Sequence, residues 1–399
     1  MKILKTQLSL SSNETESIKA QLLTLGPLEQ SVFLDIETTG FNRTYDSVYL
    51  IGYLYYENHS FYIEQHLASS LQDEPVLLTS YTERMQDFSL CITYNGDMFD
   101  LAFLESRMKT LHIPCDFLSF RSLDLLKQYR PYAKFFGWDN CKLKTVEQFL
   151  GTRRDDAFDG GQLIDVYYEY IRRDDPALER VLLLHNFEDV QNLARLMRIR
   201  EFLSILTDSA VLTVALRDSL ISEEGEWRSL EIHLDRQIPF SHETWIPLQK
   251  KSPLEGLFSF EAGSSICYVT LPVTEETLRY YLPNPKDYYY LPEQDTILHK
   301  SLAADIPPRL RRAATAATCC VPRQGLFLYG GPPLADASAH PLHGFRRGPK
   351  DATVYYELDE LTHWFSQQTS PMLTAYIRGL WKIPIASSHS GAPSTDAPR

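Results

Sequence analysis

The sequence predicts an α/β domain built on a mixed sheet, followed by a strand-rich α+β domain. The first half of the chain has the order strands, helix, strand and then several helices, which is typical of a layered α/β domain. Apolar residues return to a period of two after about residue 210. The length of 399 residues allows two or three domains with cores of their own.

The composition is that of an ordinary globular protein, with 44% hydrophobic and 23% charged residues. A net charge of −13 argues against a protein that packages nucleic acid in bulk, but it allows a local basic groove. We find no apolar run of about 18 residues and no signal-peptide pattern, so we expect no membrane association. The six cysteines lack zinc-site spacing, which favours reduced thiols and a cytoplasmic protein.

In the first domain, apolar runs bounded by turn residues predict the strands, and amphipathic runs with N-terminal capping residues predict the helices. We expect strands at residues 31–37, 48–56, 59–66 and 89–95, with Asn58 near the turn of a hairpin. We expect helices at residues 11–25, 73–87, 100–111, 123–133, 143–150, 161–173 and 176–206.

The second domain is marked by alternating segments such as EWRSLEIHLDRQ and SSICYVTLPV. The tail ASSHSGAPSTDAPR is small and polar, which predicts disorder. We therefore expect a first domain at residues 1–209, an accessory domain of unknown function at 210–382 and a disordered tail at 383–399.

The segment SVFLDIETTG, residues 31–40, combines a strand with two acidic side chains. Residues two apart in a strand point to the same face, so Asp35 and Glu37 lie on one side. Apolar residues on both faces predict a buried central strand. Two carboxylates in such a place repel each other unless a positive charge lies between them.

Two further acidic residues lie in the predicted helices of the same domain, one at the start of a helix and one on the face of a long helix. Asp100 lies where a helix starts after an apolar strand, and Asp189 follows His185 by four residues in a long helix, so both project from one face. Carboxylate oxygens suit Mg²⁺ or Mn²⁺. Two such ions about 4 Å apart suit phosphoryl displacement, with His185 as general base or as a residue that orients water.

Each of these residues also has a structural interpretation. Asp97 and Asp100 both lie where a helix N-cap is expected, and an isolated histidine such as His185 is more often a buried residue with satisfied nitrogens. The three acidic stretches occur together, each at a strand end or on a helix face. Their combination favours a metal site over separate structural roles.

The segments FLDIETTG, YNGDMFD and HNFEDV resemble the three motifs of the DEDD superfamily of RNase H-like exonucleases, and its YprB-like branch in particular. The resemblance covers roughly residues 30–206 and includes LKTVEQFLG with the two arginines behind it. It implies an RNase H-like fold, two Mg²⁺ or Mn²⁺ ions, and single-stranded DNA or RNA whose 3′ end reaches them. It implies these catalytic residues, of which the four acidic ones bind metal: Asp35, Glu37, Asp100, His185 and Asp189.

Four residues near these motifs are expected to contact the strand, namely Thr38, Asn95, Arg153 and Arg154. Asn95 has the alternative role of holding the loop before the second motif. One departure from the family concerns the histidine. Tyr-type members place Tyr four residues before the last Asp and His-type members place His five before, whereas His185 has the Tyr spacing.

The expected function is a metal-dependent 3′–5′ exonuclease that hydrolyses phosphodiester bonds at single-stranded ends. One alternative is a catalytically weak nucleic-acid-binding or assembly module, against which the intact carboxylates argue. Another is a structure-specific endonuclease. DNA and RNA stay equally open as substrates, because that choice depends on contacts to the 2′-hydroxyl, and the oligomeric state is open too. In residues 305–350, seven Arg and Lys outnumber two Asp, which fits either a phosphate-binding edge or a solvated surface.

Overall fold

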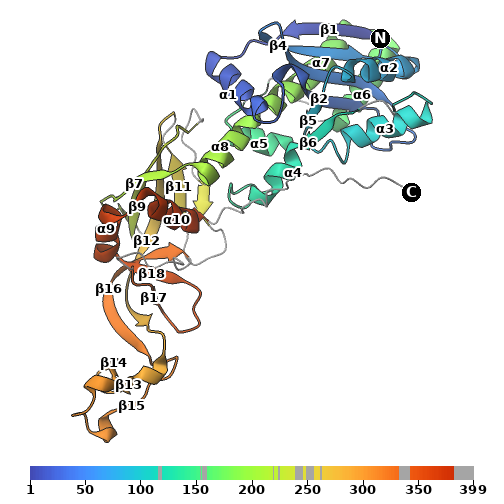
Figure 1. The fold of residues 1–399 in the computed structure, drawn as a ribbon. Coiled ribbons are helices and arrows are strands. Elements are labelled where there is room, and N and C mark those ends of the chain that lie inside the picture. Colours follow the sequence, from blue (N-terminus) through green and yellow to red (C-terminus); the bar gives the residue numbers. More distant parts are fainter. Residues whose placement is uncertain are drawn as a thin grey trace, which may run out of the picture. The chain divides into compact units, whose positions relative to one another are not determined.

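The computed structural model describes residues 1–115, 119–152, 154, 160–218, 220–222, 225–238, 246–248, 256–260, 263–331 and 342–381. The chain divides into two compact units (Figure 1). The first comprises Met1–Ala133 with Trp138–Leu203, and the second comprises Lys134–Gly137 with Ser204–Arg399. The predicted domain limits at residues 209 and 382 stay predictions. Arg153 and the predicted tail 383–399 lie outside the described residues.

The first unit is built on a six-stranded mixed sheet with the order β1-β4-β3-β2-β5-β6. The β1, β4, β3 and β2 strands are antiparallel neighbours, while β5 and β6 continue the sheet in parallel with β2. The bounds are β1 Lys2–Gln7, β2 Ser31–Thr38, β3 Val48–Glu57, β4 Ser60–Leu67, β5 Leu90–Thr93 and β6 Arg121–Asp124.

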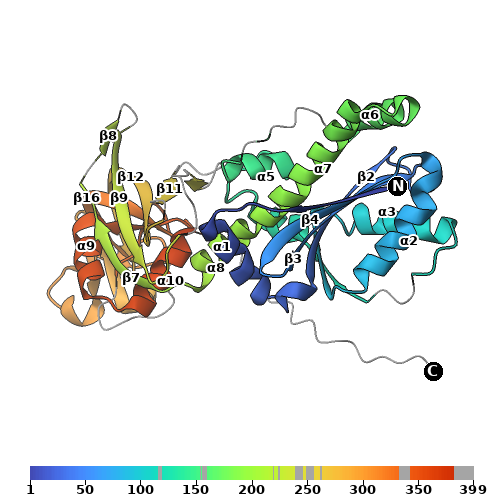
Figure 2. The same cartoon turned by 90° about the horizontal axis from the view of Figure 1, so that it is seen from above.

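Helices cover both faces of this sheet. Figure 2 shows α7 along one face and α2 and α3 along the other. The bounds are α1 Ser12–Leu23, α2 Glu74–Met85, α3 Asp100–Thr110, α4 Leu125–Tyr129, α5 Leu143–Phe149, α6 Gly160–Arg173, α7 Pro176–Arg195 and α8 Met197–Asp208.

The strand β2 lies in the middle of the sheet because apolar residues occupy both of its faces. Val32, Phe33 and Leu34 are at most 1% exposed. The predicted hairpin is present as β3 and β4. Asn58 and His59 form its two-residue turn with φ of 48° and 64°, the left-handed values that such turns need.

Two strands of the sheet were not predicted. The edge strand β1 is exposed along most of its length and carries two lysines, so it lacks the apolar alternation that marks a strand. Residues 121–124 form the short strand β6, and α4 begins only at Leu125. The predicted helix at 123–133 was therefore wrong at its start.

The predicted single helix at 176–206 is divided at Leu196 into α7 and α8. The carbonyl oxygen of Leu196 accepts hydrogen bonds from the Tyr129 hydroxyl at 2.9 Å and from the amide of Ile199 at 2.9 Å. The amide is three residues away rather than four, so the α-helical ladder stops there. The apolar periodicity continues across the break and gives no sign of it.

The second unit is strand-rich. Its largest sheet follows β10-β11-β12-β16-β18-β17, with β9 on β12 and with β7 and β8 on β9, and β14-β13-β15 form a separate three-stranded sheet. The strands are β7 Val211–Leu216, β8 Leu220–Ser222, β9 Gly225–Leu234, β10 Ile246–Leu248, β11 Gly256–Phe260, β12 Ile266–Tyr281, β13 Tyr288–Leu291, β14 Thr296–His299, β15 Arg312–Ala313, β16 Cys320–Gly331, β17 Phe345–Arg346 and β18 Val354–Glu357. The helices α9 Leu358–Gln367 and α10 Ser370–Trp381 follow these strands in the chain.

Acidic residues of this unit offset part of the positive charge of the arginine-rich residues 305–350. Arg323 makes two hydrogen bonds to Glu357, at 3.0 and 2.9 Å, and Arg347 pairs with Glu276. Arg311 donates to the carbonyl of Ala303. The prediction that this stretch contacts phosphates stays a prediction.

The predicted fold class is confirmed, since a mixed sheet flanked by helices is followed by a strand-rich unit. All six cysteines carry free thiols. Among the described helices, none combines the length and the apolar character needed to cross a lipid bilayer.

Candidate metal centre

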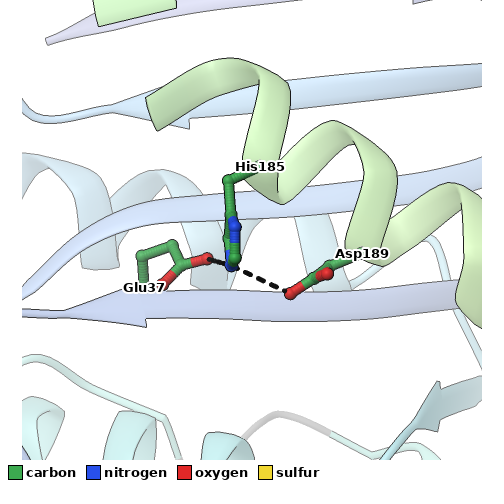
Figure 3. A group of neighbouring side chains, drawn as sticks. All are labelled: Glu37, His185 and Asp189. Atoms are coloured by element: carbon green, nitrogen blue, oxygen red, sulfur yellow. Dashed lines mark ion pairs between the residues drawn. The ribbon is translucent and has the colours of Figure 1, made fainter. Parts of the chain in front are cut away.

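The centre of the site is a group of three side chains from β2 and α7 (Figure 3). Ligand atoms of Glu37, His185 and Asp189 all lie within 4.8 Å of one another. The His185 Nε2 atom is 3.5 Å from Glu37 Oε1 and 3.3 Å from Asp189 Oδ2. Because α7 crosses the face of β2 that carries Glu37, the i, i+4 pair on the helix meets this carboxylate.

Asp35 joins this group through an amide on α7. The Asn186 Nδ2 group donates to Asp35 Oδ2 at 2.9 Å, and Asn186 Oδ1 accepts from Gln65 Nε2 at 2.9 Å. Gly52 is the partner of Asp35 in the sheet register. A Cβ atom at Gly52 would lie 2.3 Å from Asn186 Oδ1, so a glycine is needed there for the helix to approach the sheet.

Asp100 reaches β2 from the first turn of α3. Its Oδ1 accepts from the backbone amide of Ile36 at 3.2 Å, and the residue is 5% exposed. The N-cap interpretation of the two nearby aspartates was wrong. Phe99 is the N-cap residue of α3 and gives no side-chain cap, while Asp97 accepts from Lys127 Nζ at 2.6 Å and from Ser122 Oγ at 2.5 Å.

A guanidinium from outside the three motifs also contacts the acidic group. The Nη1 atom of Arg154 is 2.5 Å from Asp189 Oδ1. Its Nε and Nη2 groups donate to the two carboxylate oxygens of Glu147 at 2.6 and 2.5 Å. Glu147 lies in α5 and is 2% exposed, so Arg154 is held by a buried bidentate pair.

Burial and mutual repulsion set the protonation of the carboxyl groups. Burial, with the charges of Asp189, Glu37 and Asp100, raises the pKa of Asp35 well above its ordinary value. Burial raises the pKa of Asp100 to about 7. Burial also acts to raise the pKa of Asp189, but the hydrogen bond from His185 and the charge of Arg154 hold it below its ordinary value.

The residues present fit a divalent cation. Asp189 Oδ1 is buried and completes no hydrogen bond, because the nearby Arg154 Nη1 lies outside hydrogen-bond geometry and is itself unsatisfied. This buried carboxylate oxygen therefore has an electrostatic contact with Arg154 but no hydrogen bond, which leaves it available to a cation. Carboxylate oxygens also form the donor set that Mg²⁺ and Mn²⁺ prefer. The residues that would hold the ions are Asp35, Glu37, Asp100 and Asp189.

Two of the predicted strand-contacting residues, Thr38 and Asn95, make local hydrogen bonds. The Thr38 hydroxyl donates to the carbonyl of Gly40 at 2.7 Å. Asn95 has φ of 67°, and its carbonyl accepts from the amides of Met98 and Phe99 at 3.1 and 2.9 Å. Asn95 therefore shapes the loop before Asp100.

Several residues that position the site were missed in the sequence. Asn186, Gln65 and Gly52 orient Asp35, and Glu147 holds Arg154. Asp124 Oδ1 accepts from the amide of Asn95 at 2.9 Å and so fixes the loop of the second motif. A glycine within the bulky strand VYLIGYLYYE was the one visible signal, since such a glycine often marks a close approach.

Exposed apolar side chains surround the loops that follow β2 and β5. Phe41 is 78% exposed, Tyr45 83% and Met98 62%. The Phe41 ring lies 6.4 Å from the ring of Phe99, which directly precedes Asp100. The loop from residue 39 to 47 is braced, since Arg107 Nη1 donates to the carbonyl of Thr44 at 2.8 Å. The two loops thus carry exposed apolar side chains close in the sequence to Glu37 and Asp100.

Comparison with known proteins relates a large part of the first unit to a known family. The model of the RNase H superfamily matches residues 32–200. YprB of Bacillus subtilis (strain 168), a protein described as uncharacterized, is 30% identical over 167 residues, which cover 41% of this chain and 40% of YprB. The chain therefore matches less than half of the length of this relative.

Solved structures with a weaker likeness include a polymerase and two nucleases. The family B DNA polymerase from the archaeon Pyrobaculum calidifontis is 18% identical, with a TM-score of 0.37 over 45% of this chain and 25% of its own. The EXO domain of Aedes aegypti Nibbler is 15% identical, with a TM-score of 0.25 over 48% and 93%. E. coli Exonuclease I in complex with a dT13 oligonucleotide is 10% identical, with a TM-score of 0.28 over 92% and 76%.

The likeness to these solved structures is weak, so the family relationship depends on the sequence matches and on the sheet. The match to the superfamily model spans all three acidic motifs. The first motif lies on β2, the second directly follows the neighbouring parallel strand β5, and the third lies on α7, which packs on β2. This relationship supports a nuclease-type function. Residues 32–200 form an RNase H-like domain that is similar to YprB.

Proposed function

We propose that this protein is a metal-dependent 3′–5′ exonuclease that hydrolyses phosphodiester bonds at the ends of single-stranded nucleic acid. The observation that carries the proposal is the meeting of Glu37, His185 and Asp189 within 4.8 Å, with Asp35 and Asp100 held beside them. Carboxylates this close, and this buried, are costly unless cations neutralise them.

Two Mg²⁺ or Mn²⁺ ions bound here would supply Lewis-acid stabilisation of the charge that develops on the phosphate. The chain itself supplies orientation. Asn186 fixes one oxygen of Asp35, and the Ile36 amide fixes one oxygen of Asp100. His185 directs its Nε2 into the group and is the residue that accepts a proton from the attacking water or orients that water.

The strand would reach the site along the loops after β2 and β5. Phe41, Tyr45 and Met98 offer exposed surface on which unpaired bases can stack or pack. We assign contacts with the nucleic-acid strand to the loops that contain Thr38 and Asn95, and to the guanidinium of Arg154. Arg153 is assigned the same role from the sequence.

The alternative from another class is a nucleic-acid-binding or assembly module with little catalysis. The presence of all four carboxylates and of His185 in one group favours the enzyme. A structure-specific endonuclease would use the same chemistry and differs in needing no strand end. DNA and RNA remain parallel candidates as substrates, since the choice depends on contacts to the 2′-hydroxyl.

Digestion of linear and circular single strands tests the proposal. The full chain is incubated with linear DNA, linear RNA and circular DNA in Mg²⁺, Mn²⁺ or EDTA, beside the Asp189→Asn variant. We expect degradation of a linear strand with either metal, and no degradation in EDTA or with the variant. Cutting of the circle would indicate an endonuclease, and intact linear strands under all conditions would favour the binding module.

A further inference from the structure

Arg154 is a cation built into the acidic group by the chain itself. Its side chain is 10% exposed and that of Asp189 is 15% exposed, so their contact is largely shielded from water. Charges that close interact far more strongly in such a place than at the surface. The guanidinium cannot give up its charge by losing a proton.

The segment after α5 is shaped to deliver this side chain. Gly151 follows the helix with φ of 70°, and the Thr152 amide donates to the Glu147 carbonyl at 2.9 Å. The chain therefore turns back over the end of α5, which lets Arg154 reach Glu147 seven residues earlier. Glu147 uses two oxygens to hold two of the guanidinium nitrogens, and the third nitrogen faces Asp189.

Both carboxylate oxygens of Asp189 have a nitrogen beside them. Oδ1 lies 2.5 Å from Arg154 Nη1, and Oδ2 lies 3.3 Å from His185 Nε2. The contact at Oδ1 is too poorly aligned to be a hydrogen bond. It is an electrostatic contact that a second cation could replace.

We propose that Arg154 competes with a divalent cation for Asp189, and that Glu147 sets the strength of this competition by sharing the guanidinium charge. The inference deepens the proposed function, because it concerns loading of the same metal centre. In the metal-free protein Arg154 keeps the acidic group compact. Metal binding moves Arg154 away from Oδ1.

If Arg154 competes with the metal, substitutions of Arg154 and of Glu147 change the metal affinity in opposite directions. Arg154→Met keeps the aliphatic stem but removes the competing charge, so the metal binds more tightly. Glu147→Gln keeps the shape but removes the counter-charge that shares Arg154, so Arg154 holds Asp189 more firmly and the metal binds more weakly. A purely structural role for the pair would weaken metal binding in both variants.

Mn²⁺ titration by isothermal calorimetry measures this directly on the full chain. Wild type, Arg154→Met, Glu147→Gln and the control Arg84→Met are compared at about 0.5 M KCl, where long-range charge effects are screened. Arg84 belongs to the same unit and pairs with Glu64 and Asp87. Circular dichroism and melting in EDTA show that each variant is folded. We expect about tenfold tighter binding for Arg154→Met, weaker binding for Glu147→Gln and an unchanged constant for Arg84→Met.

The outcomes separate this inference from the proposed function. If wild type binds Mn²⁺ and degrades linear strands but Arg154→Met binds the ion with unchanged or lower affinity, the inference is wrong and the proposed function stands. Tighter binding by Glu147→Gln would also overturn the inference. If wild type binds no Mn²⁺, both the metal-dependent function and the competition are wrong.

Discussion

At the scale of single residues, the orientation of Asp35 depends on the absence of a side chain on the neighbouring strand. Gly52 leaves the space that Asn186 fills, and Asn186 donates to Asp35. The position of one carboxylate oxygen of Asp35 is therefore set by a glycine on β3 and an amide on α7. A methyl group in this space would push α7 from the sheet.

Gly52→Ala is expected to destabilise the first unit by about 1–3 kcal/mol through overpacking. It is also expected to slow strand cleavage, because Asn186 loses its hold on Asp35. Gly26→Ala is the matched control, since a Cβ there meets nothing within 4 Å. Urea unfolding and cleavage rates are compared for the two variants. Equal behaviour of both would contradict the packing argument.

His185 is expected to contribute to rate rather than to folding. His185→Ala should lose roughly 10²–10⁴-fold in cleavage rate, the usual contribution of a positioned acid or base. His185→Tyr should retain part of the activity if the residue mainly orients water, because Tyr-type relatives place Tyr at this spacing. Single-turnover rates give both values. A wild-type rate in His185→Ala would remove this residue from the mechanism.

Asp100 makes the metal-free protein less stable as pH rises. Burial raises its pKa from the ordinary value of about 3.9 to about 7, so between these values the folded state binds a proton that the unfolded chain has released. Unfolding free energy therefore falls as pH rises through this window. The pKa of Asp189 is lowered, so its effect on the unfolding free energy falls at pH values below this window.

Asp100→Asn removes this titration. In EDTA, the unfolding free energy should fall from pH 5 to pH 8 by about 2–3 kcal/mol less in the variant than in wild type. Urea unfolding at the two pH values gives the difference. Added Mn²⁺ should stabilise wild type more at pH 8 than at pH 5, because metal and proton compete. Parallel pH profiles for variant and wild type would show that Asp100 is ionised throughout.

At the scale of elements, a buried ion pair joins α2 to α3 and holds the loop that follows the first motif. Arg107 on α3 makes hydrogen bonds of 2.8 and 2.7 Å to Glu74 at the start of α2, and both residues are at most 7% exposed. Glu74 also accepts from the Val48 amide at 2.9 Å, and Arg107 holds the carbonyl of Thr44. The pair thus fixes the loop after β2 against α3.

Arg107→Ala is expected to cost about 3–5 kcal/mol, because it leaves Glu74 buried without its partner. Lys127→Ala removes a cation from the exposed pair with Asp97 and should change the urea midpoint little. Equilibrium unfolding in urea compares the two. A small effect of Arg107→Ala would mean that water or another group reaches Glu74.

The elements that could be predicted were those with a strong apolar pattern. The strand of the first motif, the β3–β4 hairpin and most helices follow from periodicity and turn residues. The exposed edge strand β1 and the four-residue β6 lack such a pattern, and the break at Leu196 depends on a hydroxyl from a distant helix. At the site, the motif residues could be predicted, whereas Glu147 and Gln65 act through contacts that no local pattern records.

At the scale of the whole molecule, the RNase H-like domain occupies residues 32–200 and a strand-rich unit follows it. In the proposed function, the full chain removes nucleotides from the 3′ end of a single strand at the acidic group on β2, α3 and α7. We therefore expect both a defined direction of digestion and a dependence on Asp35.

Digestion of one oligonucleotide with the label at either end tests this claim most directly. With Mg²⁺, a 5′-labelled strand should shorten as a ladder of single-nucleotide steps, while a 3′-labelled strand should release labelled mononucleotide from the first time point. Asp35→Asn and EDTA should abolish both patterns. A ladder from the 3′-labelled strand with mononucleotide from the 5′-labelled one, or full activity in Asp35→Asn, would contradict the account.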